Sequence, residues 1–277
     1  THALRERFCP PGAAVTDSLR PGDDTLAHLI CNGDYLPQAG RFAATEGLGD
    51  FFGTLGTTEC AKYLCTLYLQ DLSDFIRATV TDKFEIVRYG EQIALAIDSF
   101  DRLEEELSSA PNPIEERMFG LLEAHLDATQ PACVGFTVPF PGCLLSALRC
   151  AQYIRQHRPG IRIVMGGGYP STELRSMSDK GIFRYIDYLV LDDGELPLER
   201  ILTGGPLVHT YTADGYHEGE GTVTHLERGC PDFEGLPHRA YLSLMEVTNP
   251  MHRLWSDGRW NKMTLAHGCY WAKCAFC

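Results

Sequence analysis

A regular alternation of strand-like and helix-like segments begins at Ala132, and it restricts the possible folds more than any other feature of the chain. Three short apolar runs have the composition of buried strands, at residues 132–138, 161–165 and 186–191. Each run is followed by turn residues and then by a stretch that predicts a helix, at about residues 143–157, 171–177 and 195–202. This order is typical of a parallel sheet with crossover helices, so we expect an α/β fold.

The first 130 residues carry no motif, and their pattern favours helices. Apolar residues recur at helical spacing between Glu59 and Thr79, which predicts an amphipathic helix. A second helix is predicted to run to Ala128, because Asn112 can cap it and Pro113 suits its first position. We therefore expect a helical elaboration ahead of the sheet.

The expected domain organisation has three segments. A first domain covers residues 1–205, a linker with short strands covers 206–260, and a further domain begins at 261–277. The linker assignment follows from its many turn residues and its lack of a long periodic stretch. Because the first residue is Thr1 and the last, Cys277, stands inside a motif, we expect the chain to be a piece of a longer protein.

Charge and hydropathy exclude several kinds of partner. The chain has 24 Lys and Arg against 37 Asp and Glu, a formal net charge of −13. An acidic surface argues against a nucleic-acid partner and against a polybasic membrane anchor. No apolar run approaches the ~20 residues that a membrane helix needs, and the first residues given do not show a basic region followed by an apolar stretch. We expect a cytoplasmic protein without nucleic-acid or membrane partners.

Eleven cysteines are present, and three of them close the chain in a C-x4-C-x2-C loop: Cys269, Cys274 and Cys277. The other eight are scattered, which in a chain of 277 residues predicts reduced core thiols rather than a disulfide framework. The loop follows directly on a strand candidate, residues 261–266. Three thiolates on one loop can hold a [4Fe-4S] cluster and leave the fourth iron without a protein ligand, open to chemistry.

Zinc is the alternative occupant of this loop. His267 and the three cysteines would supply four tetrahedral ligands. Zinc sites usually combine two short ligand clusters across a longer spacer, however, and this segment offers a single cluster. With zinc, the chain would be a non-enzymatic α/β module that binds a nucleotide-like ligand and carries a structural metal site.

A run of three glycines, Gly166, Gly167 and Gly168, stands between a predicted strand and a predicted helix. In open α/β sheets, ligands bind at the carboxyl ends of the strands. Glycines allow the backbone to approach a ligand, and a helix amino terminus favours an anionic group. The same run is equally compatible with a tight turn that contacts no ligand.

The cysteine loop resembles the cluster loop of radical S-adenosylmethionine enzymes. Gly268 before the first cysteine and Phe276 before the third match that family, whereas its commonest spacing is C-x3-C-x2-C, one residue shorter. The resemblance implies that the three cysteines are metal ligands, that the open iron binds S-adenosylmethionine, and that Phe276 packs near the adenine. It also implies an electron donor such as a flavodoxin or a ferredoxin, and a (β/α) barrel whose first strand and cluster loop would be residues 261–277.

The region of the predicted strands resembles the Rossmann-like cobalamin-binding domain of one large radical S-adenosylmethionine class. The matching stretches are residues 134–138, 163–168, Asp187, Gly194-Glu195, and a bridge at 231–237 with Tyr241-Leu242. The resemblance implies cobalamin as a further cofactor, held by Thr137, the three glycines and Glu195. One branch of these domains ligates cobalt through a D-x-H-x-x-G motif, which this sequence does not contain.

Together these resemblances imply an enzyme that performs radical methyl transfer or a radical rearrangement. Its substrate would be a small molecule or a peptide in natural-product biosynthesis or peptide modification. The chain as given is expected to be inactive, because a barrel that stops after its first strand cannot enclose S-adenosylmethionine.

Overall fold

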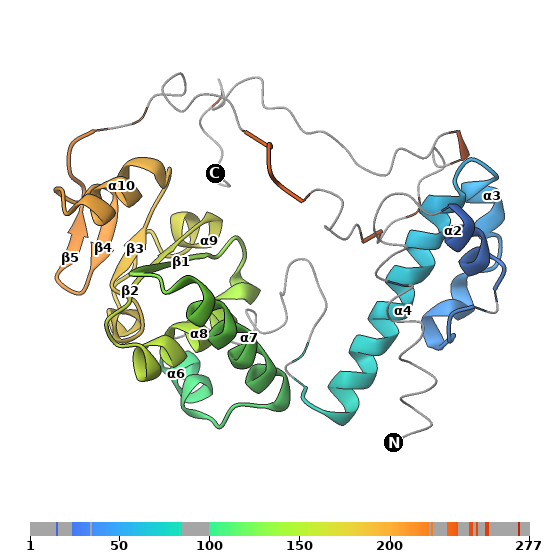
Figure 1. Ribbon diagram of the computed structural model, residues 1–277, viewed down its shortest axis with the longest axis horizontal. Helices are drawn as coiled ribbons and strands as arrows, with labels where there is room; N and C mark the ends of the chain where they lie inside the picture. The colour runs from blue at the N-terminus through green and yellow to red at the C-terminus, as the bar shows by residue number, and fades with distance from the viewer. Residues whose placement is uncertain are drawn as a thin grey trace. The chain divides into compact units, whose positions relative to one another are not determined.

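The computed structural model describes residues 15, 24–33, 35–82, 84, 100–221, 223, 232–237, 244–245, 248, 253–254 and 271 (Figure 1). The chain divides into two compact units. We call residues 1–72 with 233–277 the helical unit, and residues 73–232 the sheet unit. This division differs from the expected one, in which residues 1–205 form one domain and 206–260 a linker.

The sheet unit contains a five-stranded mixed sheet in the order β1-β2-β3-β4-β5. Its strands are β1 (Cys133–Thr137), β2 (Arg162–Gly166), β3 (Tyr188–Val190), β4 (Thr210–Thr212) and β5 (Gly215–His217). The first three are parallel to one another, as the sequence predicts, and β4 and β5 are antiparallel. The α/β class is therefore confirmed, with a sheet that is parallel only in its first part.

Two connections join the parallel strands. α8 (Leu144–His157) links β1 to β2, and the shorter α9 (Gly168–Thr172) and η3 (Gly181–Arg184) lie between β2 and β3. The spatial order of the described strands equals their order in the sequence. Within the described part of the sheet, the strand order therefore never reverses, whereas doubly wound nucleotide-binding sheets reverse at the point where the ligand binds.

The main core of the sheet unit lies on one face of the sheet. Three helices cover this face: α6 (Phe100–Ser108), α7 (Pro113–Thr129) and α8. Figure 1 shows these helices in green shades beside the strands. Side chains alternate along β2, so that Ile163 and Met165 join this core while Val164 points to the opposite face. There Val164 packs with Val190 and with Ile201 of α10 (Glu195–Thr203).

Local sequence explains how α7 begins. The Asn112 side chain accepts hydrogen bonds from the amides of Ile114 and Glu115 at 2.9 and 3.1 Å, and Glu115 accepts from the Asn112 amide at 2.9 Å. Pro113 occupies the first turn, where its missing amide proton costs nothing. This capping box confirms Asn112 as the cap predicted from the sequence.

A buried arginine joins the three helices of the main core. Arg149 on α8 is 4% exposed. It donates to the carbonyl oxygens of Glu106, Leu107 and Ser109 at 2.8 to 3.1 Å, just beyond or within the last turn of α6. It also pairs with Glu115 at the start of α7, at 3.0 Å. Because these partners satisfy its donors, the guanidinium can be buried.

The hairpin of β4 and β5 occupies part of the expected linker. Each strand has three residues, too few for an alternating pattern to stand out in the sequence. Thr210 is buried, and the rings of Tyr211 and Tyr216 lie 4.7 Å apart across the pair. The sequence predicts a strand over 208–211, which overlaps β4 but starts two residues early.

The helical unit contains α2 (Asp24–Cys31), η1 (Gly40–Ala44), α3 (Leu48–Phe52) and most of α4 (Thr57–Thr79). α4 confirms the amphipathic helix predicted for residues 59–79. Its apolar face packs against α2 and η1 in a core that includes Ala27, Phe42 and Cys65. Among the described residues, no helix has both the length and the apolar character needed to cross a membrane.

Candidate functional site

The carboxyl ends of the parallel strands gather most of the residues that the resemblance assigns to cofactor binding. Thr137 ends β1 and Gly166 ends β2, and the two are direct partners in the register of this pair. The pairing continues past β1, where the Val138 amide donates to the Gly166 carbonyl oxygen at 2.7 Å. Glu195 begins α10 a short way beyond the end of β3. Thr137 and the glycine run thus lie together, and Glu195 follows the third strand at the same edge of the sheet.

The glycine run packs closely against the chain's own backbone. Gly167 has a φ of +119°, and a Cβ at this position would lie 2.7 Å from the Val138 carbonyl oxygen. A Cβ at Gly168 would lie 3.0 Å from the Pro139 carbonyl oxygen. The lack of side chains here is therefore explained by the close approach of residues 138 and 139, in agreement with the tight-turn alternative.

The helix after the glycine run is shorter than predicted. α9 ends at Thr172 and holds five residues, whereas the sequence predicts a helix that extends to Met177. Five residues give little more than one turn. We therefore assign no anion-binding role to the amino terminus of α9.

A strip of small exposed residues remains available to a ligand. Gly135 and Thr137 are exposed on the face of β1 that points away from the main core. Gly168 and Glu195 are exposed as well. A ligand that lies over these positions would meet backbone, the Thr137 hydroxyl group and the Glu195 carboxylate.

A polar cluster that the sequence does not reveal holds the turn after β3. The Asp192 amide donates to Ser171 Oγ at 2.8 Å, and the Asp192 carboxylate pairs with Arg175. The Tyr211 hydroxyl group donates to the Arg175 carbonyl oxygen at 2.8 Å. These contacts join α9, the turn after β3 and β4. The two residues in each of these contacts are 17 to 36 positions apart along the chain, so no spacing in the sequence predicts the contacts.

Tyr169 follows the glycine run directly. Burial raises the pKa of its phenol group, and the nearby negative charge of Glu173 raises it further. The phenol therefore remains protonated across the neutral range, and the Tyr169 side chain packs against the main core.

Asp187 lies away from the other residues of the resemblance. It precedes β3, and its carboxylate accepts from the Ile163 amide at 2.8 Å near the amino end of β2. The same carboxylate pairs with Arg155 of α8. Asp187 thus ties two strands and a helix together at the amino ends of the strands, which indicates a role in positioning the sheet.

The residues of the cysteine loop that carry the predicted chemistry lie outside the described residues. These are His267, Gly268, Cys269, Cys274, Phe276 and Cys277. Within the described part of the chain, no group of three or more His, Cys, Asp or Glu side chains could hold a metal ion. The metal-ligand assignments of Cys269, Cys274 and Cys277 therefore stay predictions from the sequence.

Comparison with known proteins gives no relative for this chain. No family model, no curated protein and no solved structure matches it.

Proposed function

We propose that the chain is the amino-terminal part of a radical S-adenosylmethionine enzyme, in which Cys269, Cys274 and Cys277 hold a [4Fe-4S] cluster. The observation that carries the proposal is the C-x4-C-x2-C loop. Three thiolates close together bind an iron-sulfur cluster and leave one iron to bind a substrate or cofactor. When bound at that iron, S-adenosylmethionine supplies one-electron chemistry.

Each residue of the loop has a separate task in this proposal. The three cysteines must be deprotonated to act as ligands, which couples assembly of the site to proton release. Phe276 lies between two ligands in the sequence and would present an apolar ring to the adenine. Residues 261–266 would be the first strand of a barrel, with the loop at its carboxyl end.

The sheet unit would bind cobalamin in the same proposal. The register that places Thr137 beside Gly166 supports a ligand edge at the ends of β1 and β2. Since Val138 and Pro139 already fill the space beside Gly167 and Gly168, direct contacts would come from the exposed Thr137, the Gly168 backbone and Glu195. The reaction would be methyl transfer or rearrangement on a small molecule or peptide, with reduction by a flavodoxin- or ferredoxin-like donor.

A variant series tests the metal assignment. The chain is reconstituted without oxygen using iron and sulfide, and bound iron is measured for the wild type and for Cys269→Ala, Cys274→Ala and Cys277→Ala. We expect each substitution to remove most of the bound iron. Cys230→Ala is the matched control, because Cys230 belongs to the scattered cysteines and should leave the iron content unchanged.

His267→Ala separates the cluster from the zinc alternative. A cluster with three cysteine ligands does not need His267, so this variant should retain its iron. A tetrahedral zinc site would lose its fourth protein ligand and much of its affinity. Colourless protein that binds zinc, and loses it in His267→Ala, would overturn the proposal in favour of a binding module.

Titration with hydroxocobalamin tests the sheet unit independently of the cysteines. We expect saturable binding that weakens when Thr137 is replaced by a bulky residue, as in Thr137→Trp, because the exposed edge of β1 would be covered. Unchanged binding in this variant, or none in the wild type, would contradict the assignment of this edge.

A further inference from the structure

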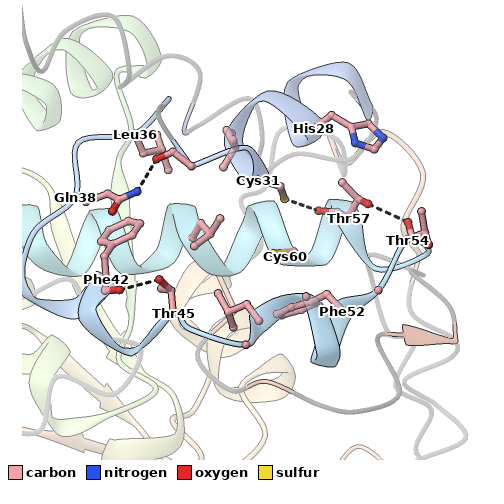
Figure 2. A pocket seen from close by; sticks show the side chains of 17 residues that line it. His28, Cys31, Leu36, Gln38, Phe42, Thr45, Phe52, Thr54, Thr57 and Cys60 are labelled. Atoms are coloured by element: carbon pink, nitrogen blue, oxygen red, sulfur yellow. Dashed lines mark hydrogen bonds between the residues drawn. The ribbon is translucent and has the colours of Figure 1, made fainter.

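The helical unit contains a cavity of about 540 Å³ between α2, η1, α3 and the first turns of α4. Apolar side chains line much of it, among them Leu36, Phe42 and Phe52 (Figure 2). Its rim includes exposed residues such as Gln38 and Gly49, so small solutes can enter. The cavity lies in a part of the chain to which the sequence assigned no function.

Two cysteine thiols from different helices meet at this cavity. Cys31 is the last residue of α2, and Cys60 lies in the first turn of α4. Both are half-buried, both are free thiols, and both line the cavity (Figure 2). The Cys31 thiol donates a hydrogen bond to the Thr57 carbonyl oxygen, with 3.4 Å between the sulfur and the oxygen (Figure 2).

The side-chain interaction between Cys31 and Cys60 gives the two thiols different pKa values. It lowers the pKa of Cys60, because the Cys31 thiol donates to the Cys60 thiolate, and this outweighs the opposing effect of burial. The same interaction raises the pKa of Cys31, and burial and the nearby Cys60 and Cys65 sulfurs add to the rise. Cys60 also lies in the first turn of a long helix, where the dipole favours a thiolate. One sulfur is thus prepared to attack, and its neighbour holds a proton.

We propose that Cys60 and Cys31 form a redox-active dithiol that reacts with low-molecular-weight disulfides entering the cavity. The Cys60 thiolate attacks one sulfur of the small disulfide, forms a mixed disulfide, and releases the other half as a thiolate. The Cys31 sulfur then loses its proton and attacks Cys60 Sγ, which forms the Cys31–Cys60 disulfide and releases the second half as a thiol. From the Cys60 thiolate and the Cys31 thiol, the protein loses two electrons and one proton, and the small disulfide becomes one thiolate and one thiol.

Other thiols of the described chain lack this arrangement. Burial raises the pKa of Cys150 to about 11, and burial also raises the pKa of Cys133. Cys65 is fully buried and does not line the cavity. Among the described residues, moreover, no set of three metal-binding side chains exists, which favours thiol exchange over a three-ligand metal site for the Cys31 and Cys60 pair.

Peptide mapping after reaction with oxidised glutathione tests the proposal. Cleavage at basic residues and before aspartates places Cys31 in residues 24–33 and Cys60 in residues 50–62, apart from every other cysteine. In the wild type we expect these two peptides to become joined by a disulfide. In Cys31→Ser we expect the 50–62 peptide to keep one glutathione, because nothing resolves the mixed disulfide.

Two matched variants complete the experiment. Cys60→Ser should leave the 24–33 peptide unmodified over the same time, and Cys150→Ser should behave as the wild type. The rate of alkylation in the native wild type gives a readout that needs no variant: the 50–62 peptide should be labelled several-fold faster than the peptide with Cys150. Equal labelling of the two, or no disulfide between residues 31 and 60, would overturn the proposal whatever the variants do.

Discussion

Single residues decide much of the local structure of the sheet unit, and Gly167 is one of them. Its φ of +119° is a backbone conformation that residues with a Cβ rarely adopt, and a Cβ would contact the Val138 backbone. We expect Gly167→Ala to lower the free energy of unfolding by about 3 kcal/mol, as measured by urea denaturation.

Gly120 provides the control for this substitution. It lies inside α7, where a Cβ would meet open space. Gly120→Ala should raise stability by up to about 1 kcal/mol through helix propensity. Equal effects of the two substitutions would mean that Gly167 does not have the close contact with Val138.

Arg149 holds together the three helices α6, α7 and α8 of the main core. Arg149→Met would leave the Glu115 carboxylate and the carbonyl oxygens at the end of α6 without their buried donor. We expect a loss of about 3–5 kcal/mol in the free energy of unfolding. Arg117→Met, at an exposed position of α7, should change stability by less than about 0.5 kcal/mol in the same assay.

Cys150 predicts a pH dependence of stability. Burial raises its pKa to about 11, above the value of about 8.5 for a thiol in an unfolded chain. Below the pKa of the unfolded chain, the Cys150 thiol is protonated in both the folded and the unfolded state, and its contribution to folding stability is fully present. Between the two values the unfolded state alone loses its proton, so stability falls as pH rises. In Cys150→Ala, the free energy of unfolding should fall less steeply as pH rises between these two pKa values. A fall as steep as in the wild type would contradict the burial of this thiol.

At the scale of elements, the sequence predicts those whose signals are local. β1, β2, β3, α4, α7, α8 and α10 follow from apolar runs, helical spacing and caps. α9 ends at Thr172, and residues 173–176 form turns and a bend where the sequence predicts helix. The strand predicted over 208–211 overlaps β4, whereas β5 is too short to show alternation. At the candidate site the carboxyl-edge position of Thr137 and Gly166 could be predicted, since parallel strands end at one edge. The cluster of Ser171, Arg175 and Asp192 could not, because only tertiary packing unites it.

The cap of α7 gives a direct test of one local signal. Asn112→Ala removes the acceptor for the amides of Ile114 and Glu115 and should cost about 1 kcal/mol of stability in urea denaturation. Asn112→Ser keeps an oxygen acceptor at the cap and should cost much less. If both variants lose the same stability, the capping box contributes little.

At the scale of the whole molecule, the division into two units could not be predicted, because it joins residues 1–72 with 233–277 across more than half the chain. Periodicity and turn signals act over short distances, so they carry no information on such a pairing. Among the described residues, the main core of the sheet unit is built from residues between Phe100 and Tyr211.

Residues 73–232 are therefore expected to fold alone. Expressed as a separate segment, they should unfold in one cooperative transition with the far-ultraviolet circular dichroism of an α/β protein. A segment that unfolds without cooperativity would show that its core depends on the helical unit.

The central functional claim concerns the cysteine loop, and acid-labile sulfide tests it most directly. In the chain reconstituted and purified without oxygen, we predict about four sulfide and about four iron per chain, as a [4Fe-4S] cluster requires. Both should be lost together when Cys274 is replaced by Ala. Protein that binds metal through the loop but contains no acid-labile sulfide would contradict the account and leave an α/β module with a structural metal.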